Sequence, residues 1–371
     1  GHGELSSDQV GDLTAALAPF YNLGTVNLDS VAIVRPEISV LIVAKPQTSF
    51  SEKDKFKIDQ YVMNGGRVLW LIDRLGVSLD SMAGGRKFIP QDLPLNLEDI
   101  LFKYGVRIQP NLVLDLQNTK IPLAVGQVGN NAQIELFPWF YHPAVAPSSG
   151  HPIVKNLDRV QLFFPSTIDT IRTKTAVKKT VLLASSKYSR VQFSPIELGF
   201  EILRYPEDPS KFDKGPQNVA VLLEGIFPSA YEGRVSAEME AGLKQMGTPF
   251  RAQSQPTRQI VVSDGDLAAC MYNKKKGRYE QLGVNVFEKE FGNQIYPYAN
   301  RAFLLNCIEY LMQPNGIIEA RSKEVKLRLL DKTAAVKNRT NWQLLNIVVP
   351  ILLLGAFGWA FNFWRNRKFA R

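Results

Sequence analysis

Cysteine is scarce in this chain of 371 residues, and the scarcity limits its chemistry. The two cysteines, Cys270 and Cys307, are 37 positions apart, and neither lies in a CxxC motif or beside a histidine. This argues against a zinc site and against a disulfide scaffold. A single disulfide between the two cysteines is still compatible with the sequence if the body faces an oxidising compartment. Cys307 lies in an apolar stretch, where a buried thiol is expected. The sequence therefore predicts no metal site and no cofactor.

Histidine is equally rare, and the three that occur are poorly placed for a nucleophile-base relay. His142 and His151 each precede a proline in an irregular region, so we interpret them as surface or packing residues. His2 stands next to the first residue of the chain. Because no G-x-S-x-G elbow frames Ser185 or Ser186, we interpret these serines as turn residues that make local hydrogen bonds.

Motifs for nucleotides and nucleic acids are also missing. The segments MNGGR (63–67) and MAGGRK (82–87) lack the G-x-x-x-x-G-K-[ST] spacing, so the chain is not itself an ATPase. No RNP-like motif, zinc finger or basic helix with interleaved aromatics is present. We therefore predict no nucleic-acid partner, although the formal net charge is +9.

Charged residues are absent between Arg339 and Arg365, and the interval is strongly apolar. Because about 20 helical residues cross a hydrocarbon core of roughly 30 Å, the interval predicts a transmembrane helix over 342–364 followed by a basic tail over 365–371. Aromatic residues typical of membrane interfaces are Trp342, Trp359 and Trp364. The alternative is a buried core helix, but no later segment is available to cover it.

Basic residues flank the predicted span on both sides. Four follow it, and seven precede it between positions 321 and 339: Arg321, Lys323, Lys326, Arg328, Lys332, Lys337 and Arg339. This count favours a cytoplasmic body, but the rule is weak for large domains, and an upstream first helix usually dominates the orientation. Since residue 1 is Gly rather than Met, we expect a processed or truncated chain whose upstream part can hold that helix.

Short apolar strands alternate with amphipathic helices in the body, which predicts an α/β fold with a mostly parallel, doubly wound sheet. Strands at 38–46 and 67–73 flank a helix with Ser51 as its N-cap, so these segments form a βαβ unit. A second helix is expected to open at Asn96 and to end at Gly105. Further strands are expected at 180–186, 218–225 and 259–266, and a closing helix at 299–312.

The periodicity fades between Thr119 and Pro165, where proline, glycine, asparagine and aromatic residues predominate, and this stretch predicts an irregular, loop-rich insertion. The expected domains are the first part of the body at 1–118, the irregular lobe at 119–178, the second part of the body at 179–315, a basic connector at 316–341, the transmembrane helix at 342–364 and the tail at 365–371.

Ligands of open α/β sheets bind beyond the carboxyl ends of the strands. The expected ligand-binding residues are His2, Glu4, Ser185, Ser186, Arg190, Glu224, Asp264 and Asp266. Other residues near these ends are Lys45, Asp73, Arg74 and Tyr188. Asp264 and Asp266 could hold a cation, but an Asp-Gly pair after a strand is more typical of a turn that caps a helix.

Several spaced segments resemble one family. They are GHGELS, HPIVKNLDRV, SSKYSR, LLEGIFPSAYEGR, VVSDGDL and LLDKTAAVKNRTNWQLLNIVVPILLL. Together they cover nearly the whole chain and resemble the auxiliary protein of a gliding-motility-associated ABC transporter, the GldG type. The resemblance implies a glutamine-amidotransferase-like body outside the cytoplasmic membrane of a bacterium, beside permease and ATPase partners. It also implies an N-terminal stretch that this chain lacks, and it supplies no ligand.

Catalysis by a class I amidotransferase needs a cysteine on a strand-to-helix elbow together with a histidine and a glutamate. The strand at 67–73 instead continues into Arg74 without a cysteine, and no histidine follows His151. We therefore interpret the body as a non-catalytic use of an enzyme fold, in a substrate-binding or auxiliary subunit. One alternative is a membrane-bound hydrolase or glycan-processing enzyme whose acid and base come from Glu4, Glu224, Asp264 and Asp266. Another is a structural interaction protein of the envelope.

Overall fold

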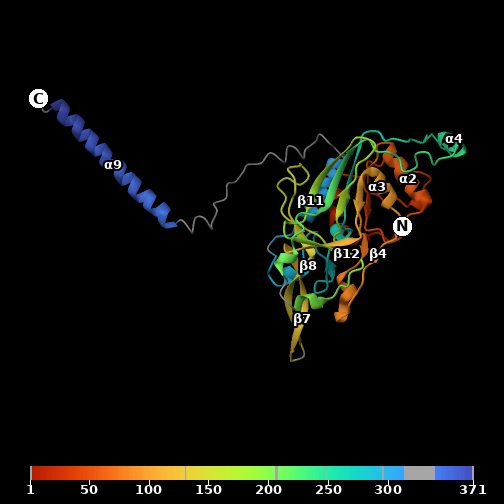
Figure 1. Cartoon of the computed structure of the whole chain (residues 1–371), viewed down its shortest axis with the longest axis horizontal. Coiled ribbons are helices and arrows are strands. Elements are labelled where there is room, and N and C mark those ends of the chain that lie inside the picture. The colour runs from red at the N-terminus through yellow and green to blue at the C-terminus, as the bar shows by residue number, and fades with distance from the viewer. Residues whose placement is uncertain are drawn as a thin grey trace. The chain divides into compact units, whose positions relative to one another are not determined.

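A computed structural model describes residues 2–129, 131–204, 208–245, 247–294, 296–312 and 339–369. The chain divides into two compact units, 1–322 and 323–371. The first is the α/β body and the second contains one described helix, α9 (Arg339–Phe369) (Figure 1). Most of the predicted basic connector lies outside the described residues.

The body contains helices and strands in irregular alternation. Its α-helices are α1 (Gly11–Leu17), α2 (Glu52–Met63), α3 (Glu98–Tyr104), α4 (Ala237–Gln245), α5 (Val286–Glu290) and α6 (Asn300–Met312). Its 3₁₀ helices are η1 (Leu28–Ser30), η2 (Leu79–Gly85), η3 (Phe200–Arg204), η4 (Pro209–Lys211) and η5 (Asp266–Ala268). Its strands are β1 (Val40–Ala44), β2 (Arg67–Leu71), β3 (Leu75–Gly76), β4 (Gln91–Asp92), β5 (Val106–Ile108), β6 (Asn111–Asp115), β7 (Asn118–Val128), β8 (Asn131–Val145), β9 (Val160–Gln161), β10 (Ile168–Thr170), β11 (Val177–Ala184), β12 (Ser189–Phe193), β13 (Asn218–Gly225), β14 (Thr257–Val262), β15 (Tyr272–Asn273) and β16 (Arg278–Tyr279).

Five strands form the central sheet in the order β1-β2-β14-β13-β11. The pairs β1-β2 and β2-β14 are parallel, whereas β13 is antiparallel to both of its neighbours. The fold is therefore mixed α/β, and the mostly parallel sheet that the sequence predicts is not confirmed. The connection from β13 to β14 explains the difference: its helix α4 buries only Leu243, so it does not cover the sheet as a crossover helix would.

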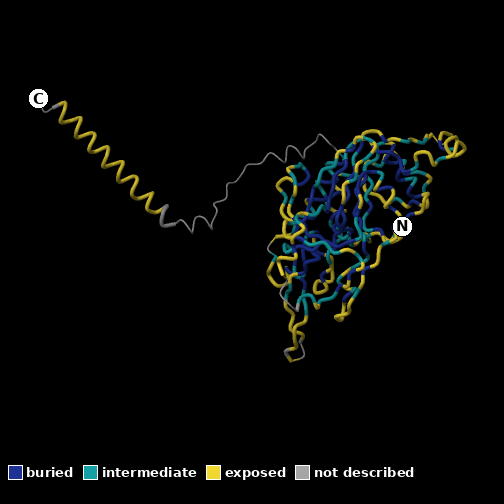
Figure 2. The backbone as a smooth tube through the Cα atoms, viewed as in Figure 1, coloured by how far each residue is buried: buried dark blue, intermediate teal, exposed yellow. Residues whose placement is uncertain are grey.

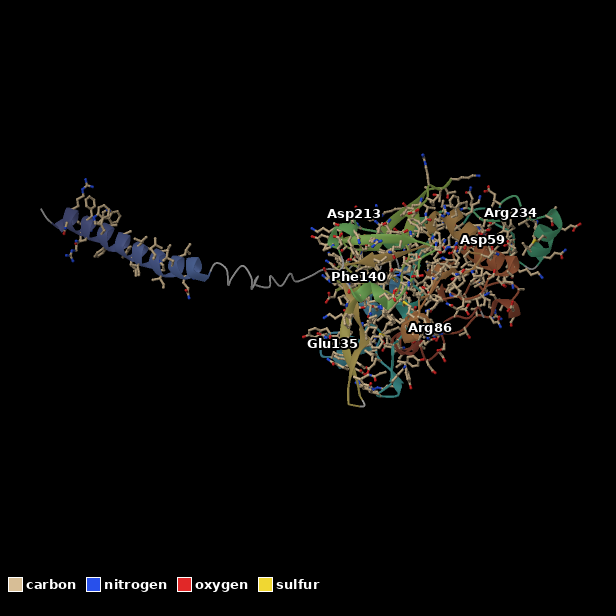
Figure 3. All side chains as sticks on the ribbon, turned by 60° about the horizontal axis from the view of Figure 1, so that its bottom comes forward. Asp59, Arg86, Glu135, Phe140, Asp213 and Arg234 are labelled. Atoms are coloured by element: carbon tan, nitrogen blue, oxygen red, sulfur yellow. The ribbon has the colours of Figure 1, made fainter. Side chains whose placement is uncertain are left out.

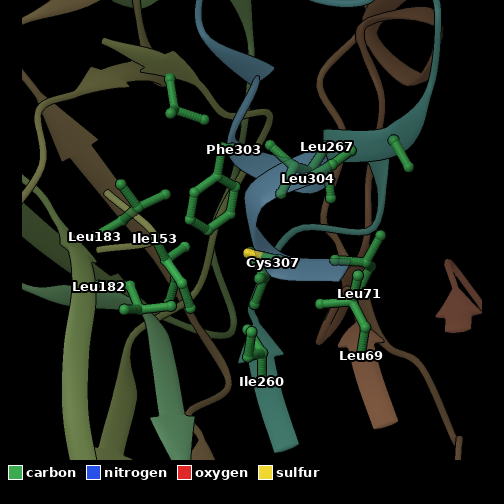
Figure 4. Packing of buried hydrophobic residues seen from close by; sticks show 14 of the residues in the cluster. Leu69, Leu71, Ile153, Leu182, Leu183, Ile260, Leu267, Phe303, Leu304 and Cys307 are labelled. Atoms are coloured by element: carbon green, nitrogen blue, oxygen red, sulfur yellow. The ribbon is translucent and has the colours of Figure 1, made fainter. Parts of the chain in front are cut away.

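Strand β2 is apolar from Val68 to Leu71 because both faces of the sheet are covered. Val68 and Trp70 face the layer that contains α2 and α3, and Leu69 and Leu71 face the layer that contains α6. All four side chains are fully buried. Figure 4 shows the second layer, in which Cys307 of α6 lies against the sheet among these leucines. Each such side chain contributes about 1.5–3 kcal/mol by its burial.

Caps define the ends of the two helices on the first face. The Ser51 hydroxyl accepts a hydrogen bond from the Asp54 N–H, which confirms the predicted N-cap of α2. Helix α3 begins at Glu98, two residues later than predicted, because Asn96 has a φ of 60° and its amide donates to Phe50 instead of capping the helix. The predicted end at Gly105 is confirmed by its left-handed conformation.

Strands β7 (Asn118–Val128) and β8 (Asn131–Val145) pair as a long antiparallel hairpin, whereas the sequence predicts an irregular stretch here. Pro122 and Gly126 are tolerated in β7 because this strand lies at the edge of its three-stranded sheet and the pairing shifts register beside Gly126. The base of the hairpin packs with β6 and η3 in a separate apolar cluster that contains Trp139. This lobe is therefore folded around its own small core.

The second unit is described by α9 alone. Residues Gln343–Lys368 of this helix are long and apolar enough to cross a membrane. An 18-residue window within this stretch has a mean hydropathy of 2.2, and none of that window is buried against any part of the chain that the structure describes. Figure 2 shows the contrast between this exposed helix and the buried interior of the body. The candidate membrane span is thus a single apolar helix with Pro350 inside it.

Candidate functional site

Four charged residues meet at the carboxyl ends of the three parallel strands. Lys45 follows β1, Asp73 follows β2, and Asp264 and Asp266 follow β14. The Lys45 ammonium lies 2.5 Å from Asp266 Oδ1 and 3.6 Å from Asp73 Oδ2. A Cβ atom at Gly265 would lie 2.7 Å from the Cβ atom of Lys45, so the glycine permits this close approach. We call these four residues the strand-end cluster.

Hydrogen bonds from the backbone hold the acids of the strand-end cluster. Asp73 Oδ1 accepts from the Gly265 N–H at 2.6 Å, and Asp264 accepts from the N–H groups of Phe163 and Asp266, each at 2.8 Å. The last of these bonds is the local turn that an Asp-Gly pair predicts. The cluster therefore joins three strand ends and the segment around Phe163. No group of His, Cys, Asp and Glu residues in the described part of the chain is arranged to hold a metal ion.

Burial and the charges within the cluster together shift the pKa values of its members. Burial and the Asp266 carboxylate raise the pKa of Asp73 to about 7, although Lys45 opposes the shift. Burial also raises the pKa of Asp264 well above its usual range. Burial lowers the pKa of Lys45, but the charges of Asp266 and Asp73 outweigh this effect, so the pKa of Lys45 is raised.

The N-terminal residues lie along the segment that follows Lys45. The carbonyl oxygen of His2 accepts from the N–H groups of Gln47 and Thr48, and its ring stacks on Phe50 with centroids 3.8 Å apart. Glu4 is exposed, and its carboxylate accepts from the His2 N–H at 2.7 Å. The structure thus brings His2 and Glu4 to the loop between β1 and α2.

The predicted serines and Arg190 form a separate group. The Ser186 hydroxyl donates to Asp115 at 2.7 Å, and the Ser185 hydroxyl accepts from the Gln217 N–H at 2.8 Å. Both bonds join distant segments, because the partners are 71 and 32 positions apart. The local turn bond that the sequence predicts is the one that the Ser186 hydroxyl accepts from the Tyr188 N–H at 3.0 Å. Arg190 belongs to β12, which pairs with β6 outside the central sheet. Because β11 lies two places from β14 in the sheet, the structure does not join this group to the strand-end cluster.

Glu224 lies at the other end of the strands from Asp264, because β13 runs antiparallel to β14 and its last residues pair with the first residues of β14. It stands opposite Arg258, six positions before Asp264. At about 3.3 Å per residue, Glu224 and Asp264 are roughly 20 Å apart along the strands. Glu224 instead accepts from the Arg258 guanidinium at 3.1 Å and from the Tyr310 hydroxyl at 2.7 Å. Glu224 and Asp264 therefore cannot flank one glycosidic bond, which requires about 10 Å or less.

A cavity of about 360 Å³ opens beside α3, and a smaller recess joins the same walls to Asp73. We call it the α3 cavity. It is lined by Arg74, Glu98, Asp99, Phe102, Lys103, Arg107, Ile108, Pro110, Ala230 and Arg234. Its volume falls in the range of small-molecule sites. Because Arg74 follows Asp73 directly, the cavity lies next to the carboxyl end of β2, where ligands of open α/β sheets bind.

Two buried contacts fix the walls of the α3 cavity. Asp59 of α2 is fully buried and accepts from the Tyr104 hydroxyl of α3 at 3.0 Å and from the Ala230 N–H at 3.0 Å. Lys55, also buried, lies 2.8 Å from Asp99. Helix α3 and the loop after β13 are therefore both held by α2. Figure 3 labels Asp59 and also Arg234, four residues beyond Ala230.

Sequence reasoning did not find this cavity. Lys103, Arg107 and Arg234 come from a helix, a minor strand and a loop, and no shared motif links them. The one available signal is Arg74, which follows a predicted strand and lines the cavity. Lys103, Arg107 and Arg234 lie near Arg74 only because tertiary packing brings their elements together.

Comparisons with known proteins concern mainly the body. A family model described as an ABC-type uncharacterized transport system matches residues 1–307, which include every described strand. None of the curated proteins matches the chain. A solved structure, the mmIFT52 N-terminal domain, is similar at 9% sequence identity with a TM-score of 0.43, over 85% of this chain and 95% of that one. A likeness at this TM-score carries no argument about fold or function.

Proposed function

This chain belongs to the ABC-type uncharacterized transport system family, and on that premise we propose that it is a non-catalytic, membrane-anchored auxiliary subunit of an ABC transporter. The family match over 1–307 is the observation that carries the proposal. Membership in a transport system implies partnership with transporter components. We assign the partner roles to a permease and an ATPase, because the chain has no nucleotide-binding loop of its own.

The anchoring part of the proposal is supported by α9. Its Gln343–Lys368 stretch is exposed and apolar, and Trp359 and Trp364 lie near its C-terminal end, where interfacial aromatics are common. Arg365 and Arg367 follow directly and suit a lipid headgroup region. In this role, the helix keeps the body beside its permease.

The non-catalytic part is supported by the contacts of the candidate acids. Asp73, Asp264 and Asp266 bind the backbone and Lys45, while Glu224 lies at the other end of the strands. Both cysteines are buried, so neither offers an exposed nucleophile. The strand-end cluster thus supports a structural role, and no observation favours the hydrolase alternative. Ligand binding by His2, Glu4, Ser185, Ser186 and Arg190 remains a proposal.

We further propose that the transporter acts in bacterial gliding motility, with the body on the periplasmic side of the inner membrane. The support is the resemblance of six spaced segments to the GldG type. The orientation is tested by protease treatment of intact spheroplasts that express the full-length chain. Digestion of the body before lysis agrees with a periplasmic location, whereas protection until lysis overturns it.

Purification of the tagged full-length protein from its native membrane tests the subunit role. A permease and an ATPase should be recovered in constant ratio with the tagged chain, and an untagged strain should yield neither. Recovery of the chain alone, in mild detergents and after cross-linking, would overturn the proposal. Removal of α9 should reduce this recovery if the helix contacts the permease.

A further inference from the structure

The α3 cavity carries an excess of positive charge. Four basic and two acidic side chains line it. Both acids have basic partners: Glu98 is paired with Arg74, and Asp99 with Lys55. No ion pair engages Lys103, Arg107 or Arg234 within the described part of the chain. The three cations come from α3, β5 and the loop after β13, so they approach the cavity from three separate elements.

Arg74 adds an unsatisfied donor to the same wall. Its two terminal nitrogens bind Glu98 and Asp92, but its buried Nε finds no acceptor among the described residues. Buried donors of this kind are rare in folded proteins because an unmade hydrogen bond is costly. Because this atom is buried, Arg74 contributes to the cavity through its positive charge.

Apolar side chains line the rest of the cavity. Phe102 is 49% exposed although it is a large aromatic residue, and Ile108 and Pro110 also line the cavity. A bare inorganic anion has no apolar part that could pack against this surface. The lining therefore suits a ligand with an anionic end and a ring or an aliphatic part.

We propose that the α3 cavity binds an organic phosphomonoester. A phosphomonoester carries a charge of about −1.5 to −2 at neutral pH and three acceptor oxygens, which matches three unpaired cations better than one carboxylate does. Arg107 and Arg234 bind phosphate oxygens, Lys103 adds a third positive charge, and the organic part packs on Phe102. The inference rests on the proposed binding role of the body and names its ligand class.

The geometry of this site is set before a ligand arrives. Asp59 holds the loop that carries Arg234, and the Lys55–Asp99 pair holds the helix that carries Lys103 and Phe102. Preformed walls reduce the ordering cost of binding. Asp59 and Lys55 are therefore positioning residues, and the cations make the contacts.

Calorimetric titration of the full-length chain in a non-ionic detergent tests the proposal. Phenyl phosphate should bind one to one, and about tenfold more tightly than inorganic phosphate, which lacks the ring, or benzoate, which lacks the second charge. Its affinity should fall below about pH 6, where the dianion is protonated. Failure to bind phenyl phosphate, or equal affinity for benzoate, would overturn the proposal.

Two exposed arginines permit variants that leave the core untouched. Arg107→Gln and Arg234→Gln should each lower the affinity for phenyl phosphate about tenfold, since each substitution removes charge-assisted hydrogen bonds. Arg278→Gln, an exposed arginine of β16 outside the cavity, is the matched control and should bind like the parent. Unchanged affinity in the double variant R107Q/R234Q, with an unchanged unfolding midpoint, would overturn the assignment.

A soluble lipid phosphate tests whether the natural phosphomonoester is a lipid or a water-soluble ester. Dihexanoyl phosphatidic acid should bind more tightly than phenyl phosphate if the natural ligand is a lipid, and less tightly if it is a water-soluble ester. In both cases the double variant R107Q/R234Q should lose the binding. Co-purification with a permease and an ATPase does not depend on these arginines, so a failed titration is distinguishable from a failed subunit role.

Discussion

Lys45 and Asp266 are 221 positions apart in the chain, yet the Lys45 ammonium lies 2.5 Å from Asp266 Oδ1. This ion pair joins the end of β1 to the segment after β14, and Asp73 from the strand between them lies 3.6 Å from the same ammonium. One lysine thus links the ends of three parallel strands. Its removal affects three elements at once.

Lys45→Met should therefore lower the free energy of unfolding by about 2 kcal/mol. Loss of one partner of a fully buried pair costs about 3–5 kcal/mol. The effect is smaller here because the Lys45 side chain is 21% exposed. Urea unfolding followed by tryptophan fluorescence measures it. Lys178→Met is the control, because Lys178 is 73% exposed and 4.0 Å from Glu224, so its change should stay below about 0.5 kcal/mol. Equal effects in the two variants would contradict the structural role of the cluster.

Asp73 should make the stability of the body depend on pH. Its pKa is about 7 in the folded chain and about 4 in an unfolded one, so the folded state binds more protons between these values. Stability from this group is therefore greatest below about pH 4 and is lost as the pH rises through 7. The unfolding free energy of the parent should fall relative to Asp73→Asn from pH 4 to 8. Asp80→Asn, an exposed residue outside the cluster, is the control, and a rise in the parent relative to Asp73→Asn would contradict the assignment.

Asp59→Ala should destabilise the body by about 3 kcal/mol. The substitution leaves the Tyr104 and Ser229 hydroxyls and the Ala230 N–H without their shared acceptor in a buried site. It should also weaken the binding of phenyl phosphate, because the loop that carries Arg234 loses its attachment to α2. Thermal unfolding and the calorimetric titration measure the two effects. Asp29→Ala changes an exposed aspartate and should leave both unchanged.

Truncation after Ser322 should release the body from the membrane without unfolding it. All of the described sheet and core residues of the body precede this position, and the candidate span follows it. The truncated chain should fractionate with soluble protein and show the cooperative unfolding of the full-length chain. A truncated chain that stays with the membrane would show that α9 is not its only attachment.

The two cysteines should resist thiol reagents in the native state. Cys307 is completely buried, Cys270 is 5% exposed, and burial raises the pKa of both thiols. Maleimide should label neither at neutral pH until denaturant is added. Ser30→Cys places a thiol on an exposed turn and should be labelled at once. Rapid labelling of the parent protein would contradict the packing of α6.

Much of the local structure of the body could be predicted from the sequence. Strand β13 was expected at 218–225 and has those bounds, and Ser51 caps α2 as its position predicts. The direction of β13 could not be predicted, because an apolar run looks the same in a parallel and an antiparallel strand. The β7-β8 hairpin was missed because its prolines and glycines hide the alternation that marks a strand.

Two properties of this protein depend only on contiguous residues, and the sequence by itself determined them. They are a charge-free apolar stretch between Arg339 and Arg365 and the lack of a nucleotide-binding loop. The tertiary structure alone decided which polar residues meet. Lys45 reaches Asp266 and Glu224 is carried to the other end of the strands because strand direction places them there, and Arg107 and Arg234 line one cavity because α2 holds both of its walls. Strand direction and loop path arise from packing between distant segments, so no local pattern records them.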